Sequence, residues 1–213
     1  MQAEKRAAVF LDRDGTINEE VGYLDSVGKL RLIPGAAEAI RLLNEKGLKT
    51  IVVTNQSGVA RGFFTEAFVE TVHSRIQELL AAEGAVIDGF YYCPHHPTEG
   101  RGPYLQDCDC RKPAPGLLRC AAAEHGIDPS RSFVVGDTLK DIEAGGRVGI
   151  PGILVLTGYG REALAALEAQ TDGPGTCPDA SLATERHPRN IRPVHVAADL
   201  GAAVRWILRS LRP

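Results

Sequence analysis

An apolar run at residues 7–11, without alternating polar positions, constrains the fold of this chain more than any other feature. A strand buried on both faces has this pattern, and such strands belong to parallel sheets covered by helices. The run leads directly into Asp12 and Asp14, followed by Gly15 and Thr16. Ligands of parallel sheets bind beyond the carboxyl ends of the strands, so the two carboxylates lie where a site is expected.

Two carboxylates separated by one residue lie on the same side of an extended strand end, where they repel each other unless a cation sits between them. We expect Mg²⁺, because it prefers hard oxygen ligands and keeps water and phosphate oxygens in its shell. One carboxylate could then act as a nucleophile while the other transfers protons. The alternative is a structural Asx-turn, in which Asp14 and Gly15 only turn the chain after the strand.

Apolar strand patterns and amphipathic helix patterns alternate along the rest of the chain. The alternation predicts a doubly wound parallel α/β sheet in a single domain spanning residues 1–213, with a long flexible loop at residues 171–193, which are rich in Gly, Pro, Ser and Thr. The further predicted strands are 49–54, 87–92, 132–136, 153–156 and 194–197, and the predicted helices are 34–47, 65–82, 114–125, 139–147 and 200–211.

Three later segments carry groups that suit a phosphate site. The strand TIVVTNQSG at residues 50–58 ends on hydroxyl and amide donors, RKP at residues 111–113 supplies a cation ahead of a helix, and SFVVGDTLKDI at residues 132–142 ends its strand on a carboxylate. Together with DRDGT at residues 12–16 they resemble, in the required order, the four motifs of the haloacid dehalogenase superfamily of aspartate-nucleophile phosphatases. The resemblance implies an enzyme that hydrolyses phosphate monoesters.

The resemblance also implies a catalytic role for four of the matched residues. Asp12 would attack phosphorus and form an aspartyl-phosphate, and Asp14 would protonate the leaving alkoxide and then deprotonate the attacking water. Lys112 and Thr54 would stabilise the negative charge of the transferring phosphoryl group. A catalytically inactive regulator on the same fold is a second interpretation, but such a chain would be expected to lack one of the key aspartates or the lysine, and all are present.

In the superfamily, magnesium is bound by the first aspartate of motif one, by the backbone carbonyl of the second, and by the aspartate of motif four. The resemblance therefore implies a Mg²⁺ site formed by Asp12, Asp14 and Asp137. Asp141, one helical turn after Asp137, would orient a metal-bound water, and its alternative is a solvated carboxylate on a helix face.

A second cluster, CPHHP at residues 93–97 and CDC at residues 108–110, contains three of the five cysteines and two of the six histidines. A Cys₃His set suits Zn²⁺ in a closed tetrahedral structural site, so residues 93–110 are predicted to form a zinc loop. The predicted ligands are Cys93, His95, Cys108 and Cys110. His96 is the rival of His95, which is favoured by the resemblance to the zinc-bearing branch of the superfamily. A disulfide and a nucleic-acid-binding zinc ribbon are the alternatives.

Composition limits the partners of the chain. The net charge of −3 does not favour binding of nucleic acid or of an anionic membrane surface. No apolar segment approaches the roughly 20 residues of a membrane span. The N-terminal MQAEKRAAVF runs into the first strand, so we expect no secretory signal, a cytoplasmic location and reduced cysteines. Cys120 and Cys177 are interpreted as ordinary residues, and the chain is predicted to be a monomer.

Too few residues separate Asp12 from Thr54 for the cap domain that many members insert there, so we expect a capless enzyme whose zinc loop borders the substrate cleft. The chain resembles the branch that acts on heptose 1,7-bisphosphate; histidinol phosphate is the close alternative, and polynucleotide-end phosphatases share the fold. The implied substrate-binding residues are Glu20, Val21, Gly22, Tyr23, Thr54, Asn55, Gln56, Ser57, Arg111, Lys112 and Thr138.

Two of these residues bear on which substrate is bound. Arg111 would bind the second phosphate, because its fork of donors matches phosphate oxygens bidentately. Thr138 stands where some members of the branch carry a lysine that contacts the substrate, and this departure concerns anomer preference.

Overall fold

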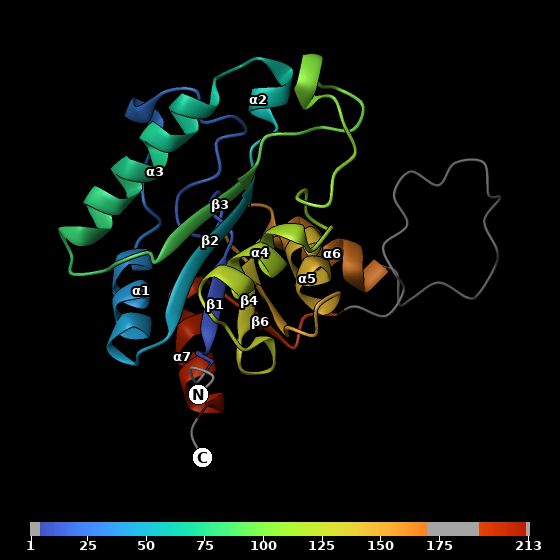
Figure 1. Ribbon diagram of the computed structural model, residues 1–213. Coiled ribbons are helices and arrows are strands. Elements are labelled where there is room, and N and C mark those ends of the chain that lie inside the picture. The colour runs from blue at the N-terminus through green and yellow to red at the C-terminus, as the bar shows by residue number, and fades with distance from the viewer. Residues whose placement is uncertain (1–4, 170–191, 212–213) are drawn as a thin grey trace, which may run out of the picture.

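The computed structural model describes residues 5–169 and 192–211. Within these residues, six strands form one parallel sheet in the order β3-β2-β1-β4-β5-β6 (Figure 1). The strands are β1 (Ala8–Leu11), β2 (Lys49–Asn55), β3 (Gly89–Cys93), β4 (Phe133–Gly136), β5 (Gly152–Val155) and β6 (His195–Ala197). The strand order reverses between β1 and β4, and open α/β sheets bind their ligands at such a switch point.

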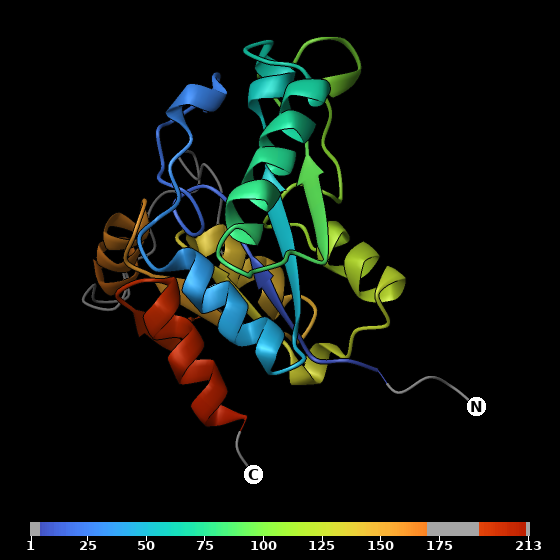
Figure 2. The same ribbon diagram turned by 90° about the vertical axis from the view of Figure 1, so that its left-hand side faces the viewer.

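Helices cover both faces of this sheet. One face carries α1 (Ala36–Glu45), α3 (Glu66–Ala81) and α7 (Leu200–Ser210), which Figure 2 shows in front of the strands in blue, green and red. The other face carries α4 (Gly116–Glu124) and α5 (Leu139–Gly146). Alternate residues of β1 supply both cores, Val9 and Leu11 on the first face and Ala8 and Phe10 on the second. The double burial of this strand confirms the expectation from its apolar run.

Side chains cap the helices where the chain enters them. The hydroxyl of Thr65 accepts a hydrogen bond from the backbone N–H of Phe68 at 3.2 Å and so begins α3. The carboxylate of Asp199 accepts from Ala202 N at 2.7 Å and begins α7. Each cap satisfies a backbone donor that the first helical turn leaves without a partner. These caps help to set the bounds of two helices on the same face of the sheet.

The predicted doubly wound sheet is confirmed, and the ends of its predicted strands and helices lie within about two residues of those observed. Two helices were not predicted, α2 (Gly58–Arg61) and α6 (Gly160–Ala169). Only Gly160 of α6 is buried, and the half-buried Ala163, Leu164 and Leu167 form a short apolar stripe that the sequence analysis did not use. The predicted loop at 171–193 lies, apart from its last two residues, outside the described part of the chain.

Three short 3₁₀ helices complete the described elements, at Val27–Lys29, Gly102–Tyr104 and Pro129–Arg131. Among residues 5–169 and 192–211, no helix is both long enough and apolar enough to cross a bilayer.

Candidate active site

A cleft opens at the carboxyl ends of β1, β2 and β4, beside the switch point of the sheet. Every sequence-predicted catalytic and substrate-binding residue lines it except Val21 and Arg111, and Asp137 lines it as well. The polar segments that follow three separate strands therefore meet at one edge. This convergence is what parallel strands impose, because their carboxyl ends all point the same way.

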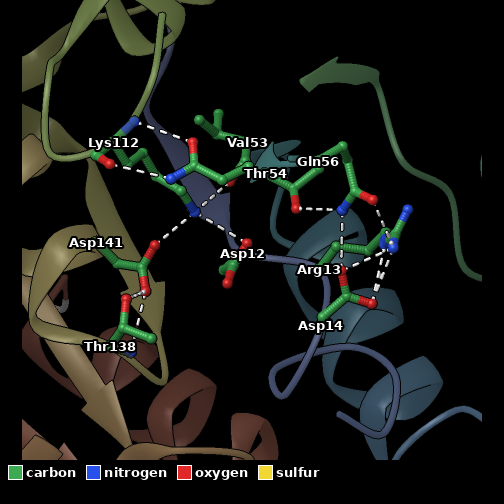
Figure 3. Close-up of polar contacts among 10 residues, drawn as sticks. Asp12, Arg13, Asp14, Val53, Thr54, Gln56, Lys112, Thr138 and Asp141 are labelled. Carbon is green, nitrogen blue, oxygen red and sulfur yellow. Dashed lines mark hydrogen bonds and ion pairs between the residues drawn. The ribbon is translucent and has the colours of Figure 1, made fainter. Parts of the chain in front are cut away.

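Lys112 contacts two carboxylates and a backbone carbonyl in the site (Figure 3). Its Nζ lies 2.9 Å from Asp12 Oδ1 and 2.5 Å from Asp141 Oδ1, and it donates to the backbone carbonyl of Val53 at 2.7 Å. Burial alone would lower the pKa of this ammonium, but the two carboxylates outweigh that effect and raise it. Lys112 is therefore charged and points at the predicted nucleophile.

The Asn55 side chain fixes the backbone on which Lys112 stands. Its Oδ1 accepts from Lys112 N and its Nδ2 donates to Lys112 O, both at 3.0 Å. We predicted Asn55 as a substrate-binding residue, and in this structure its amide is a two-point clamp on the neighbouring segment. The clamp joins the end of β2 to the segment that leads from the zinc loop into α4.

Three carboxylates converge beside this lysine. Ligand atoms of Asp12, Asp137 and Asp141 all lie within 4.8 Å of one another. Burial raises the pKa of Asp12 to about 7 against the opposing charge of Lys112, and burial together with the neighbouring carboxylates raises the pKa of Asp137 to about 8. The buried Oδ1 of Asp137 has no hydrogen-bond partner in the described part of the chain. Crowded, desolvated oxygen donors of this kind fit a hard divalent cation such as Mg²⁺.

Asp141 belongs to this cluster rather than to a solvated surface. Only 1% of it is exposed, and its Oδ2 accepts from the backbone N–H and the hydroxyl of Thr138 at 3.0 and 2.6 Å. These bonds cap the N-terminus of α5. The interpretation of Asp141 as a solvated helix-face carboxylate is therefore wrong. The capping bonds and Lys112 hold its side chain inside the cleft.

Two glycines crowd the Asp137 carboxylate. Gly15 has φ +77° and Gly158 has φ +50°, and a Cβ on either would lie 2.1 Å from Asp137 Oδ2. The same oxygen accepts from Tyr159 N at 2.8 Å. The 158–159 segment therefore fixes the direction of the carboxylate through Oδ2.

We predict that Gly158→Ala weakens Mg²⁺ binding by about ten- to a hundredfold, the range typical of losing a group that orients a metal ligand. The new methyl group would displace the Asp137 carboxylate. The matched control is Gly126→Ala, because Gly126 has a similar φ of +59° but nothing within 4 Å of the added carbon. The Mg²⁺ concentration at half-maximal activity measures the effect, and equal shifts in both variants would contradict it.

The side chain of Asp14 faces a different set of partners. Its two oxygens accept from Arg13 Nη2 at 2.9 and 2.7 Å, from Asn18 Nδ2 at 2.9 Å and from Gln56 Nε2 at 2.9 Å. Burial would raise the pKa of Asp14, but the Arg13 charge and these hydrogen bonds outweigh it and lower the pKa. Two neighbouring aspartates thus have pKa values shifted in opposite directions, that of Asp14 lowered by Arg13 and its hydrogen bonds and that of Asp12 raised by burial.

The predicted zinc ligands lie together in the loop that precedes Lys112. Cys110 Sγ is 3.1 Å from the sulfurs of Cys93 and Cys108 and 3.2 Å from His95 Nδ1. Burial and the adjacent Cys108 raise the pKa of the Cys110 thiol to about 11, and a metal ion would replace the proton. The set of three sulfurs and one imidazole nitrogen fits a tetrahedral zinc ion.

His96 faces away from this cluster. Its Nδ1 accepts from the backbone N–H groups of Thr98 and Glu99 at 3.3 and 3.0 Å, which occupies the ring in a local turn. Arg111, directly after the last cysteine, donates to the backbone carbonyl of His95 at 3.2 Å. This bond ties the predicted phosphate-binding arginine to the zinc loop, just outside the lining of the cleft.

Aromatic side chains gather around Tyr23, which lines the cleft. The rings of Tyr23 and Phe63 meet edge to face with centroids 4.6 Å apart, and Arg61 lies 5.9 Å from the centre of the Tyr23 ring. Glu20 accepts from Gly22 N within the same loop. The 20–23 loop is thereby attached to the segment that follows α2.

Sequence reasoning missed six residues that line the cleft, namely Arg13, Leu24, Gly58, Phe64, Lys140 and Tyr159. Arg13 and Lys140 lie inside motifs that were recognised, so their positions were available from the sequence. Phe64 packs where a Cβ on Gly58 would lie, 2.2 Å from the ring, and only the folded loop reveals that contact.

The site and the sheet together define a hydrolase of the haloacid dehalogenase type. A haloacid dehalogenase-like hydrolase model matches residues 2–149, and a second HAD-hydrolase-like model matches residues 109–203. The chain belongs to this family and is an enzyme of it.

Individual relatives are similar over most of their length. A D-glycero-beta-D-manno-heptose-1,7-bisphosphate 7-phosphatase from Pasteurella multocida is 47% identical over 72% of this chain and 83% of its own. A D-glycero-D-manno-heptose-1,7-bisphosphate 7-phosphatase from Thermosynechococcus vestitus is 42% identical over 98% of both chains. A crystal structure of D,D-heptose 1,7-bisphosphate phosphatase from B. bronchiseptica, complexed with magnesium and phosphate, is 32% identical with a TM-score of 0.76, covering 96% of this chain and 99% of that one.

Proposed function

We propose that the chain is a Mg²⁺-dependent phosphatase that removes the C7 phosphate of D-glycero-D-manno-heptose 1,7-bisphosphate through an aspartyl-phosphate on Asp12. The observation that carries the proposal is the pairing of Asp12 with Lys112 at 2.9 Å in a cleft at the switch point of the sheet. A buried carboxylate beside a fixed ammonium can attack phosphorus while the cation stabilises charge on the equatorial oxygens.

Other residues of the cleft would supply proton transfer, hydrogen bonding and metal binding. Asp14 would give a proton to the leaving alkoxide and later take one from the attacking water. Its lowered pKa suits the second role, and the negative charge of a bound phosphate would raise that pKa for the first. Thr54 Oγ1 accepts from Gln56 Nε2 at 3.0 Å, so its own hydroxyl hydrogen is available to a phosphoryl oxygen. Asp12 and Asp137, with the carbonyl of Asp14, would hold Mg²⁺, which when bound neutralises charge on the phosphoryl oxygens.

The proposed second phosphate would bind near the zinc loop. The cations of the cleft lining are Arg13, which is bonded to Asp14, Lys112, which is bonded to Asp12, and Lys140, at the start of α5. Burial lowers the pKa of His96, and the charges of Arg111 and Arg61 lower it further, with Lys140 acting in the same direction. Arg111 is bonded to the carbonyl of His95 and Lys140 lines the cleft, and we infer that these two cations form the binding edge for the distal phosphate.

The test compares a sugar 1,7-bisphosphate, the corresponding 7-monophosphate and histidinol phosphate. We expect the bisphosphate to be preferred over the monophosphate by about ten- to a hundredfold, since one charge-assisted contact contributes roughly 1.5 to 3 kcal/mol. Arg111→Ala should remove most of this preference while the monophosphate is still hydrolysed, because the transferring group depends on Lys112, Thr54 and the metal.

The matched control is Arg101→Ala, which removes an exposed arginine of the same zinc loop. It should leave the preference unchanged. Faster turnover of histidinol phosphate than of the bisphosphate would refute the heptose assignment and favour a histidinol-phosphate phosphatase instead.

A further inference from the structure

Arg13 is a buried arginine beside the proton-transfer group, and sequence reasoning gave it no role. Its side chain is 2% exposed, whereas that of Asp14 is 21% exposed. The guanidinium therefore lies behind the carboxylate, and the accessible side of the carboxylate is turned to the cleft, which both residues line. A charge this deeply buried is expensive unless its hydrogen bonds are satisfied.

The surroundings satisfy the guanidinium without competing for Asp14. Nη2 also donates to Gln56 Oε1 at 3.1 Å, and Nη1 lies 3.5 Å from His73 Nε2. Burial and the Arg13 charge lower the pKa of His73 to about 3, so the imidazole is neutral and accepts the bond. The ring of Phe90 stacks on His73 with centroids 4.6 Å apart. Arg13 is therefore held from behind by α3 and β3.

Gln56 links this network to the phosphate-binding end of β2. Its amide donates to Asp14 Oδ2 at 2.9 Å and to Thr54 Oγ1 at 3.0 Å, while its carbonyl accepts from Arg13. Asn18 approaches the other oxygen of Asp14 at 2.9 Å. The Asp14 carboxylate is thus oriented by three side chains, of which Arg13 alone contacts both of its oxygens.

We propose that Arg13 is a positioning residue that orients the Asp14 carboxylate for proton transfer. This inference rests on the role proposed above for Asp14. In the first step, an Asp12 oxygen bonds to phosphorus, the bond from phosphorus to the ester oxygen breaks, and the Asp14 proton passes to that oxygen to give the alcohol. In the second, a water oxygen bonds to phosphorus, the aspartyl bond breaks, and a water proton returns to Asp14. If the Asp14 carboxylate is wrongly oriented, the first step should slow only for substrates whose leaving group must be protonated as it departs.

The experiment measures kcat/KM for a series of aryl phosphates of graded leaving-group acidity, together with an alkyl phosphate. This parameter reports the first step, and the series does not depend on which sugar is the natural substrate. We expect Arg13→Met to lower kcat/KM for the alkyl ester by about thirty- to a hundredfold but for p-nitrophenyl phosphate by less than about threefold, because nitrophenolate leaves without a proton. Arg13→Lys keeps the positive charge but not the forked guanidinium. It should lower kcat/KM for the alkyl ester by about five- to tenfold, again with little effect on p-nitrophenyl phosphate.

Asp14→Asn is the positive control and should show the selective loss in full. Arg119→Met, which removes an exposed guanidinium paired to Asp109, should change neither ester. Equal losses on both esters in Arg13→Met, or in Arg13→Lys if the methionine variant does not fold, would overturn the inference by assigning Arg13 a structural role only. No selective loss in Asp14→Asn would instead refute the proposed mechanism itself, so the two failures are distinguishable.

Discussion

Asp12→Asn should lower phosphatase turnover by about four orders of magnitude or more, the scale expected when a covalent nucleophile is removed. The amide has almost the shape of the carboxylate but does not attack phosphorus. The fold should survive, because Lys112 keeps its bonds to Asp141 and to the carbonyl of Val53. The substitution also removes one of three crowded buried carboxylates, so no loss of thermal stability is expected from repulsion.

Steady-state turnover with Mg²⁺ present measures the loss, and rapid-quench incorporation of labelled phosphate tests its cause. The wild-type protein should transiently carry acid-stable phosphate label, and Asp12→Asn should not. Asp109→Asn, at an exposed carboxylate outside the cleft, is the matched control and should retain turnover. Near wild-type activity of Asp12→Asn would mean that the proposed aspartyl-phosphate does not form.

Cys108→Ser should remove the zinc ion and most of the activity. The site needs three thiolates and one imidazole within 3 to 4 Å, and a hydroxyl is a poor substitute for a thiolate on zinc. Arg111 and Lys112 directly follow Cys110, and Arg111 is bonded to the carbonyl of His95. Loss of the metal should therefore release Lys112 from Asp12 and lower turnover by about a hundredfold or more, the loss expected for electrostatic stabilisation of the transition state.

Elemental analysis of purified protein provides the direct measurement, with about one zinc per chain expected in the wild type, because thiolate-rich sites bind zinc tightly. Cys120→Ser is the matched control, since Cys120 is an exposed free cysteine on α4. It should keep both zinc and activity. Full zinc retention in Cys108→Ser, or no zinc in the wild type, would overturn the ligand assignment.

The sequence alone was sufficient for the sheet and for most of the cleft. Buried parallel strands are encoded by continuous apolar runs, as at residues 7–11, and their carboxyl ends must share one edge. Polar residues directly after such runs are therefore brought together whatever the loops do. Asp12, Thr54 and Asp137 meet for this reason. The zinc cluster was equally visible, because cysteines and histidines in a short Pro- and Gly-rich stretch have few other uses.

Tertiary structure decided which of these groups contact one another, because such contacts depend on strand register and helix placement rather than on local pattern. The bond from Lys112 to Val53 spans 59 residues of sequence and the bond from Gln56 to Asp14 spans 42. The sequence favoured Asp141 as a group that orients a metal-bound water and left a solvated helix-face carboxylate as the alternative. The close packing of α5 on β4 buries it against Lys112. Arg13 and Asp14 are neighbours in every conformation, but only the packing of His73 and Gln56 around Arg13 turns its guanidinium onto both oxygens of that carboxylate.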